Sequence, residues 1–293
     1  MSEASQILQF FLSGITLGGI YALIALGFVT TYNVTGILNF AQGEFVMLGA
    51  LLTASLVGAK VPVLVAIPIA IVGVTLIGLA LERMAIYPVR KAKIVTVIII
   101  TIGLSTAVRG LALLIWGTDP YSLAPFSSGD SINIWGARLI PQSLWIMATA
   151  VVIVAGLFWF FERTYFGKAV RACVINKLAA SLMGISPQLM SLFAIGVSAA
   201  LGAIAGIVIT PITTATYDMG LMLGLKGFVA AVLGGMTSIS GAVLGGLVLG
   251  VLEAMGAGLI SSGYKDAIAF IILLLVLFLM PNGLLGSSGN KRV

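Results

Sequence analysis

The sequence predicts an all-α polytopic membrane protein, a bundle of about eight to ten transmembrane helices with some broken or re-entrant segments. Two observations support this fold class. The mean hydropathy is +1.20, and hydrophobic residues make up 60% of the chain while charged residues make up only 8%. Nine long apolar stretches also alternate with short polar connections. These features are typical of chains that cross a bilayer repeatedly, and they argue against a soluble domain.

Each apolar stretch has the length of a helix that crosses a bilayer, roughly 20 residues. None of them shows the two-residue alternation of a barrel strand, so helices are expected. The short connections predict a single transmembrane domain over residues 1–293, with no soluble domain. The candidate spans cover residues 8–31, 36–58, 62–81, 94–116, 144–161, 189–210, 219–236, 241–260 and 266–281.

Three of these spans are less regular than the others. The second is entered through polar residues and glycines between Asn33 and Glu44. Broken backbone at membrane depth is tolerated only where protein or a water-filled cavity satisfies it. We therefore expect half-helices or a re-entrant piece in this part of the chain. The seventh and eighth spans are interrupted by glycines, so one of the two is expected to be a pair of half-helices or a re-entrant piece. These glycines are Gly220, Gly224, Gly227, Gly234, Gly235 and Gly241.

The distribution of basic residues predicts the orientation in the membrane. Segment 117–143 carries few basic residues and is bounded by Trp116 and Trp145, so it is expected to be an external loop with interfacial anchors. The positive-inside bias then places the N-terminus outside and the C-terminus in the cytoplasm of a multi-pass membrane protein. The segments expected to be cytoplasmic are 83–93, 163–177 and the C-terminal pair Lys291 and Arg292.

The residue inventory excludes several kinds of chemistry. The chain has no histidine, and Cys173 is its one cysteine, so neither a metal site nor an internal disulfide is expected. Residues 167–169 lack the serine or threonine and the upstream glycine of a phosphate-binding loop, so this chain is not expected to hydrolyse ATP. The net charge of +6 is attributed to cytoplasmic loops and not to nucleic-acid binding. Met1–Gln9 lacks the basic start of a cleaved signal peptide, so the first span is expected to be retained.

A stripe of small residues recurs every four positions in the eighth span, which places its members on one helix face. Membrane helices pack closely over such faces, because lipid supplies no hydrophobic drive between them. The stripe predicts helix packing within the bundle, a contact with another subunit or a wall of the conduit. Its members are Ala242, Gly246, Gly250, Ala254 and Gly258.

Four charged residues lie inside the predicted spans and away from the span ends: Glu44, Arg109, Lys226 and Glu253. A charge at the bilayer centre costs roughly 2.5–3.5 kcal/mol on insertion scales, so each should face protein, water or a partner charge. Lys226 and Glu253 lie in neighbouring spans and are expected to pair. Arg109 is expected to extend outward toward the 117–143 loop.

The segment 162–187 is the longest internal loop and has an ordered pattern. From Gly167 to Gly184 it is interpreted as a short helix, with Pro187 stopping it. Two roles are possible for this segment. Attachment to anionic lipid would require only its basic residues, whereas the small residues and terminal glycine of a surface helix favour docking into the groove of a partner protein.

Taken together, eight motifs in this order resemble the LivH-type permease subunit of branched-chain amino-acid ABC importers, over nearly the whole chain. The motifs are GGIYALIALGFVTTY at 18–32, NFAQGE at 39–44, ERMAIYPVR at 82–90, GKAVRAC at 167–173, AASLMGI at 179–185, AAVLGGMTSISGAVLGGL at 230–247, YKD at 264–266 and PNGLLG at 281–286.

The resemblance implies a heteromeric importer. Its partners would be a second, LivM-type permease subunit, two cytoplasmic ATPase subunits and a periplasmic substrate-binding protein. ATP and Mg²⁺ would bind to the ATPases, and this chain would need no cofactor. The resemblance also implies that the 167–185 region is the coupling helix seated in the ATPase, with Arg171, Asn176, Lys177, Ala179, Ala180 and Gly184 in that role.

Two positions depart from the family pattern. The family commonly has an acidic residue where this chain has Ile175 or Asn176, and a histidine where it has Gln42. Gln42 supplies hydrogen bonds but no titratable group, which argues against a proton-linked role there. The candidate residues for the substrate pathway are Asn39, Gln42, Glu44 and Lys226.

The expected cargo is a branched-chain or related amino acid, in a modest and mostly apolar conduit. A permease for urea or short amides remains an alternative, as does a stand-alone secondary transporter. A self-contained carrier would have no use for a docking helix, and the sequence contains no intramembrane Asp/His relay.

Overall fold

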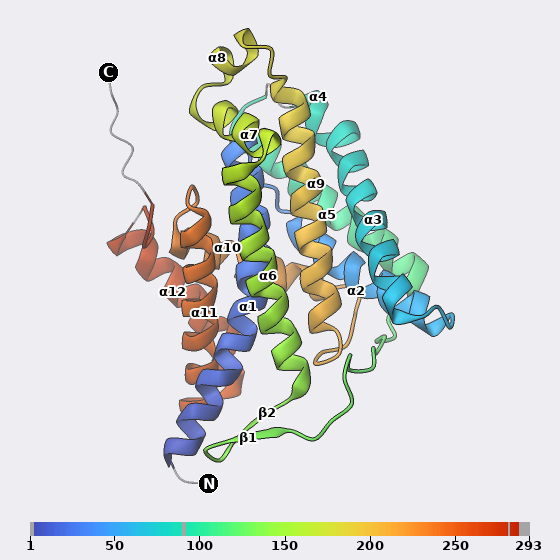
Figure 1. Ribbon diagram of the computed structural model, residues 1–293, viewed down its shortest axis with the longest axis vertical. Coiled ribbons are helices and arrows are strands. Elements are labelled where there is room, and N and C mark those ends of the chain that lie inside the picture. The colour runs from blue at the N-terminus through green and yellow to red at the C-terminus, as the bar shows by residue number, and fades with distance from the viewer. Residues whose placement is uncertain (1–2, 90–91, 281, 287–293) are drawn as a thin grey trace.

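A computed structural model describes residues 3–89, 92–280 and 282–286, and within them nearly all regular structure is helical (Figure 1). The one sheet in this part of the chain is a two-stranded antiparallel hairpin, β1 (Ile132–Ile134) with β2 (Ala137–Leu139). The helices are α1 (Glu3–Thr35), α2 (Gln42–Gly58), α3 (Val63–Leu81), the π-helical turn η1 (Glu82–Ile86), α4 (Tyr87–Val89), α5 (Ile94–Trp116), α6 (Pro141–Arg163), α7 (Tyr165–Ile175), α8 (Lys177–Leu182), α9 (Pro187–Ile209), α10 (Met219–Gly234), α11 (Ile239–Leu259), the 3₁₀ turn η2 (Ser262–Tyr264) and α12 (Lys265–Leu279).

Every predicted span corresponds to an apolar helix in the described residues. Seven helical segments there are long and apolar enough to cross a membrane, and α2 and α10 are shorter apolar helices. The second and seventh spans are therefore the incomplete ones. Of the seventh and eighth spans, one was expected to be broken or re-entrant; α11, the eighth, is continuous from Ile239 to Leu259. Residues 36–41, expected to begin the second span, precede the first residue of α2.

The helices run roughly along the long axis of the molecule (Figure 1). The ends of α3 and α6, with α4, α7 and α8, gather at one end, which we call the elbow end. The start of α1 and the β1–β2 hairpin lie at the other end, which we call the hairpin end. The two described basic segments therefore share one end, as the charge pattern predicts. Arg90, Lys91, Lys291 and Arg292 lie outside the described residues.

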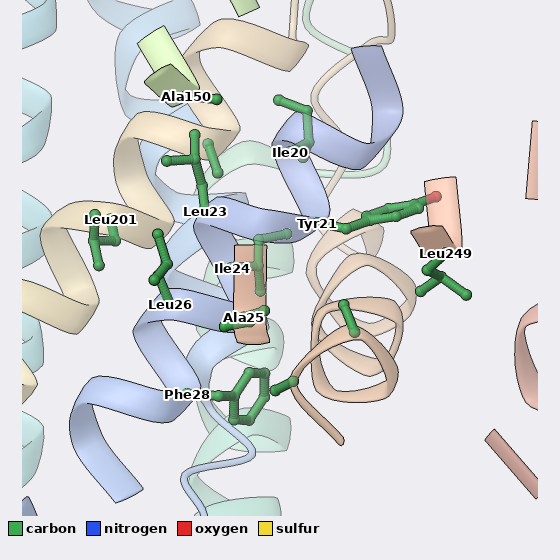
Figure 2. Close-up of a cluster of buried hydrophobic side chains, with 14 of the residues drawn as sticks. Ile20, Tyr21, Leu23, Ile24, Ala25, Leu26, Phe28, Ala150, Leu201 and Leu249 are labelled. Atoms are coloured by element: carbon green, nitrogen blue, oxygen red, sulfur yellow. The ribbon is translucent and has the colours of Figure 1, made fainter. Parts of the chain in front are cut away.

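Helix α1 forms the centre of the bundle. It has 33 residues, or about 50 Å at 1.5 Å per residue, and exceeds the roughly 30 Å hydrocarbon core of a bilayer. From Ile20 to Val29 every residue is buried, so this helix has no lipid-facing side there. Figure 2 shows side chains of α1 meeting Ala150 of α6, Leu201 of α9 and Leu249 of α11.

The small-residue stripe of α11 faces α1, so it packs within the bundle. Gly250 lies against the backbone of Gly18, and Gly246 against that of Ala22. A Cβ at Gly250 would collide with α1, so only glycine allows the two backbones to come this close. The remaining members of the stripe are the buried Ala242, the buried Ala254 and Gly258, which packs on Phe10.

The surface of the bundle is apolar along its outer helices. Leu64 of α3 and Phe278 of α12 are both more than four-fifths exposed. Contact of such a surface with water is unfavourable, whereas contact with lipid tails carries no such penalty. The exposed apolar side chains therefore fit a multi-pass membrane protein.

We expect Gly250→Ala to destabilise the protein by about 1–3 kcal/mol, because the added methyl group overpacks the α1–α11 contact. The measurement is the thermal unfolding midpoint of the detergent-solubilised protein. Gly156→Ala on the exposed face of α6 is the matched control, since no atom lies within 4 Å of its added Cβ. Equal midpoints for the two variants would contradict the close contact.

Candidate functional site

A charged cluster lies at the centre of the membrane bundle between α2 and α5. The Glu44 side chain is 1% exposed, and its Oε1 accepts a hydrogen bond from Ser105 Oγ at 2.7 Å. The same oxygen pairs with Arg109 Nη2 at 3.2 Å. Ser105 is the middle residue of the 23-residue α5, about 17 Å from either end. The pair therefore lies near the middle of α5 along the length of the helix.

The start of α2 brings Glu44 to this depth. Residues 36–41 are not helical, and side chains of Thr35, Asn39 and Thr101 accept hydrogen bonds from three of their backbone amides. Asn39 Oδ1 accepts from the Ala41 amide at 3.1 Å, and the Asn39 carbonyl accepts from the Gln42 amide at 3.1 Å. Asn39 is buried and shapes the turn from which α2 begins. This arrangement meets the condition for broken backbone within a membrane.

Helices α2 and α10 both begin near Glu44. Gly43 packs directly on the backbone of Gly220 and Gly224, close to the first residue of each helix. The N-terminus of a helix carries a partial positive charge, and here two of them converge. The Glu44 carboxylate lies beside both and offsets that charge.

Gln42 fixes the start of α2 against two other helices. Its Nε2 donates to the Ser198 carbonyl at 2.9 Å, and its Oε1 lies 2.5 Å from Ser198 Oγ. The Ser198 hydroxyl also lies 2.9 Å from the Gly27 carbonyl of α1. Gln42 is fully buried, so it joins α2 to α9 and α1.

A second charged cluster joins α10, α11 and α12. Lys226 Nζ lies 2.8 Å from Glu253 Oε1 and 2.6 Å from Asp266 Oδ1. Glu253 Oε1 also accepts from Tyr21 Oη at 3.1 Å and lies 3.4 Å from Lys265 Nζ. The pairing of Lys226 with Glu253 was predicted and is confirmed.

The structure separates the predicted pathway residues into two groups. Asn39, Gln42 and Glu44 lie together at the start of α2, while Lys226 belongs to the second cluster. The expectation that Arg109 extends toward the 117–143 loop is wrong. Arg109 turns toward Ser105, one helical turn earlier in α5, because Glu44 on another helix offers it a buried partner.

The elbow end carries the predicted docking segment, which consists of two short helices and not the single helix expected. Asn176 is extended, with φ −155° and ψ 104°, and its side chain accepts from the Ala179 amide at 3.0 Å. It therefore ends α7 and caps α8. Gly184 has φ +83° and reverses the chain after α8. Pro187 was expected to stop this helix but occupies the first turn of α9, where proline is favoured.

A small hydrophobic core ties this elbow, defined as α7 and α8, to the long helices. Val170, Cys173 and Ala180 are buried against Val34 of α1, Phe161 of α6 and Met190 of α9. Cys173 is a free, buried thiol, as predicted. Burial raises the pKa of the Cys173 thiol, and the Lys177 ammonium opposes that rise.

The six predicted coupling residues have different surroundings. Arg171 donates to the Phe161 carbonyl, and Lys177 Nζ donates to the Thr35 carbonyl at 3.1 Å. Ala180 is buried, whereas Ala179 is exposed. Large apolar residues also surround Ala179 on the surface. These are Ile175, Leu178, Leu182 and Met183, each at least 71% exposed.

A cavity of about 340 Å³ opens beneath the elbow between α1, α6, α7 and α11. Phe158 and Val174 contribute apolar walls, and Asn33 and Thr237 contribute polar groups. The elbow thus lies over a hollow, and its fixed contacts are with the ends of α1, α6 and α9.

A protein-family model described as the permease component of the branched-chain amino acid transport system matches residues 10–277. The chain belongs to this family. It is 35% identical to the high-affinity branched-chain amino acid transport permease LivH of Escherichia coli K12, covering 98% of this chain and 97% of the relative. It is 33% identical to BraD of Pseudomonas aeruginosa over the full length of both chains. A ribose import permease, RbsC of Haemophilus influenzae, is 28% identical over 93% of this chain and 83% of its own.

We expect Lys226→Met to destabilise the protein by about 3–5 kcal/mol, because it leaves the Glu253 carboxylate buried without its closest cation. Thermal unfolding of the solubilised protein measures the effect. The double variant Lys226→Met/Glu253→Gln should recover part of the loss, and Lys93→Met on the surface is the neutral control. A single variant as stable as the control would contradict a structural role for the pair.

Proposed function

We propose that this chain is a membrane subunit of an ATP-binding-cassette importer. With a second permease chain it forms the pathway for a branched-chain or related amino acid delivered by a periplasmic binding protein. Two cytoplasmic ATPase subunits bind ATP and Mg²⁺ and supply the energy, while this chain binds no cofactor. The observation that carries the proposal is the elbow, with its exposed apolar face.

The elbow has the properties of a docking element. Leu178, Leu182 and Met183 are exposed at a polar end of the molecule, where lipid tails do not reach them. Apolar side chains gathered on a short surface helix favour insertion into the groove of a partner protein. The buried core under the elbow makes it a rigid extension of α1, α6 and α9. Movement of a docked ATPase would therefore reach the long helices directly.

The location follows from the charge distribution and the family. The elbow end carries the basic residues Arg163, Lys168 and Arg171, so we place it in the cytoplasm of a cell with an inner membrane. The start of α1 then faces outward, as does the β1–β2 hairpin. This orientation puts the docking element on the side where ATP is available.

The cargo is proposed from the relatives together with the surface of the bundle. LivH and BraD are named as branched-chain amino acid permeases. The mostly apolar outer face of α5 suits an aliphatic side chain. Urea, short amides and sugars are the competing cargoes, and they belong in the same uptake assay.

We expect proteoliposomes that hold the complete complex, with the binding protein, to accumulate labelled leucine when ATP is supplied on the ATPase side. Ala179→Glu should lower this uptake by at least about tenfold, since a charge enters an apolar contact. Ala179→Ser is the matched control, because it keeps the size and stays neutral. Wild-type uptake by the glutamate variant would remove the docking role, and leucine accumulation by this chain alone would refute the dependence on ATPases.

A further inference from the structure

We propose that Arg109 is the contact for the carboxylate of the solute that crosses the membrane, on a water-accessible face of α5. Glu44 is the internal carboxylate that competes for the same guanidinium. This inference deepens the proposed function and rests on it.

The exposure of Arg109 is the first step. Its side chain is 22% exposed, whereas that of its partner Glu44 is 1% exposed. An arginine near the bilayer centre that faced lipid would be strongly unfavourable, because lipid tails do not solvate a charge. The face of α5 beside Arg109 is therefore covered by water or protein in the assembled transporter. A passage between this chain and its partner permease meets that requirement.

Unused hydrogen-bond donors are the second step. Nη2 of Arg109 serves Glu44 and Ser105, but Nε is buried with no partner. Within the described residues no acceptor reaches Nη1 either. Lys226 is different, because two carboxylates hold its ammonium and its side chain is 6% exposed. Arg109 therefore has N–H donors left for a ligand, whereas the ammonium of Lys226 is already paired with two carboxylates.

The shape of α5 is the third step. Gly103, Thr106 and Gly110 recur along the exposed face of this helix, at the depth of the ion pair. Neither glycine has an atom within 4 Å of the position of an added Cβ, so the surface there is open. Larger apolar side chains, Ile99 and Leu114, are exposed beyond each end of this stretch. The small residues leave room for a solute beside the guanidinium.

The chemistry selects the ligand. A guanidinium presents parallel N–H groups that match the two oxygens of a carboxylate. The carboxylate of an amino acid has this geometry, whereas urea and neutral amides carry no anion. Glu44 already occupies Nη2, so an arriving carboxylate exchanges with it and is held weakly. Weak holding suits a pathway, because a deep well slows release.

The first test places single cysteines on the reconstituted complex in a Cys173→Ala background. Thr106→Cys should react with a charged, membrane-impermeant thiol reagent, and saturating leucine with its binding protein should slow the reaction. Val72→Cys, exposed at the middle of α3, is the lipid-facing control and should not react. Equal inertness at both positions would overturn the water-accessible face.

The second test separates ligand contact from structural pairing. Arg109→Gln/Glu44→Gln removes both charges, so a purely structural pair predicts normal assembly and normal leucine uptake. Our proposal predicts normal assembly with leucine uptake lowered by at least about tenfold, because a charge-assisted contact is lost. Stimulation of ATP hydrolysis by the loaded binding protein should persist. Arg109→Lys, which keeps the charge, should retain more uptake than the double variant.

These outcomes are distinguishable from failure of the proposed function. A wild-type complex that transports no solute with ATP would refute the importer assignment. A wild-type complex that carries urea and not amino acids would overturn the carboxylate contact and leave the importer assignment standing. Leucine uptake at the wild-type rate by the double variant would overturn the contact alone. If the double variant fails to assemble, the cysteine experiment decides the question. A Thr106→Cys variant that reacts with the thiol reagent at the same rate with and without leucine would also overturn the carboxylate contact.

Discussion

The inability of a lipid bilayer to solvate charge and bare backbone governs this structure. Two helices, α2 and α10, begin inside the bundle, and their amide-bearing ends converge where Gly43 meets Gly220 and Gly224. An arrangement of this kind is stable only if the protein replaces the missing water. The Glu44 carboxylate lies beside Gly220 at the start of α10, and its Oε1 is paired with Arg109 and Ser105. Asn39 and Gln42 form further buried hydrogen bonds at the start of α2.

The same constraint divides the molecule into parts with different roles. Helix α1 is buried on every side and held by glycine contacts with α11, so it gives the bundle a fixed centre. A core that includes Phe161 and Met190 attaches the elbow to the long helices, which suits it to transmit force in the proposed importer. The ion pair on α5 belongs to neither part. Its Arg109 member borders the exposed, small-residue face of α5, where we propose that it meets a passing solute.

Hydropathy was sufficient to predict the nine apolar helices, because the length of an apolar run is a local property of the sequence. The local glycine and polar pattern also indicated that the second and seventh spans are unusual. Contacts between distant segments were not predictable. Arg109 was expected to extend outward because its partner, Glu44, lies 65 residues away on another helix. The division of the elbow at Asn176 depends on a capping hydrogen bond that competes with helix continuation. The apolar surface around Ala179 emerged only once the helix faces were known.

The central claim is that an open face of α5, supported by a buried counter-ion, borders a solute passage in a machine driven from the elbow. Electron cryo-microscopy of the assembled transporter in lipid nanodiscs tests this most directly. We predict an aqueous passage against Gly103, Thr106 and Gly110, with the partner permease opposite and α8 seated in an ATPase. Lipid acyl chains packed against that face, or an elbow that contacts no other subunit, would contradict the account.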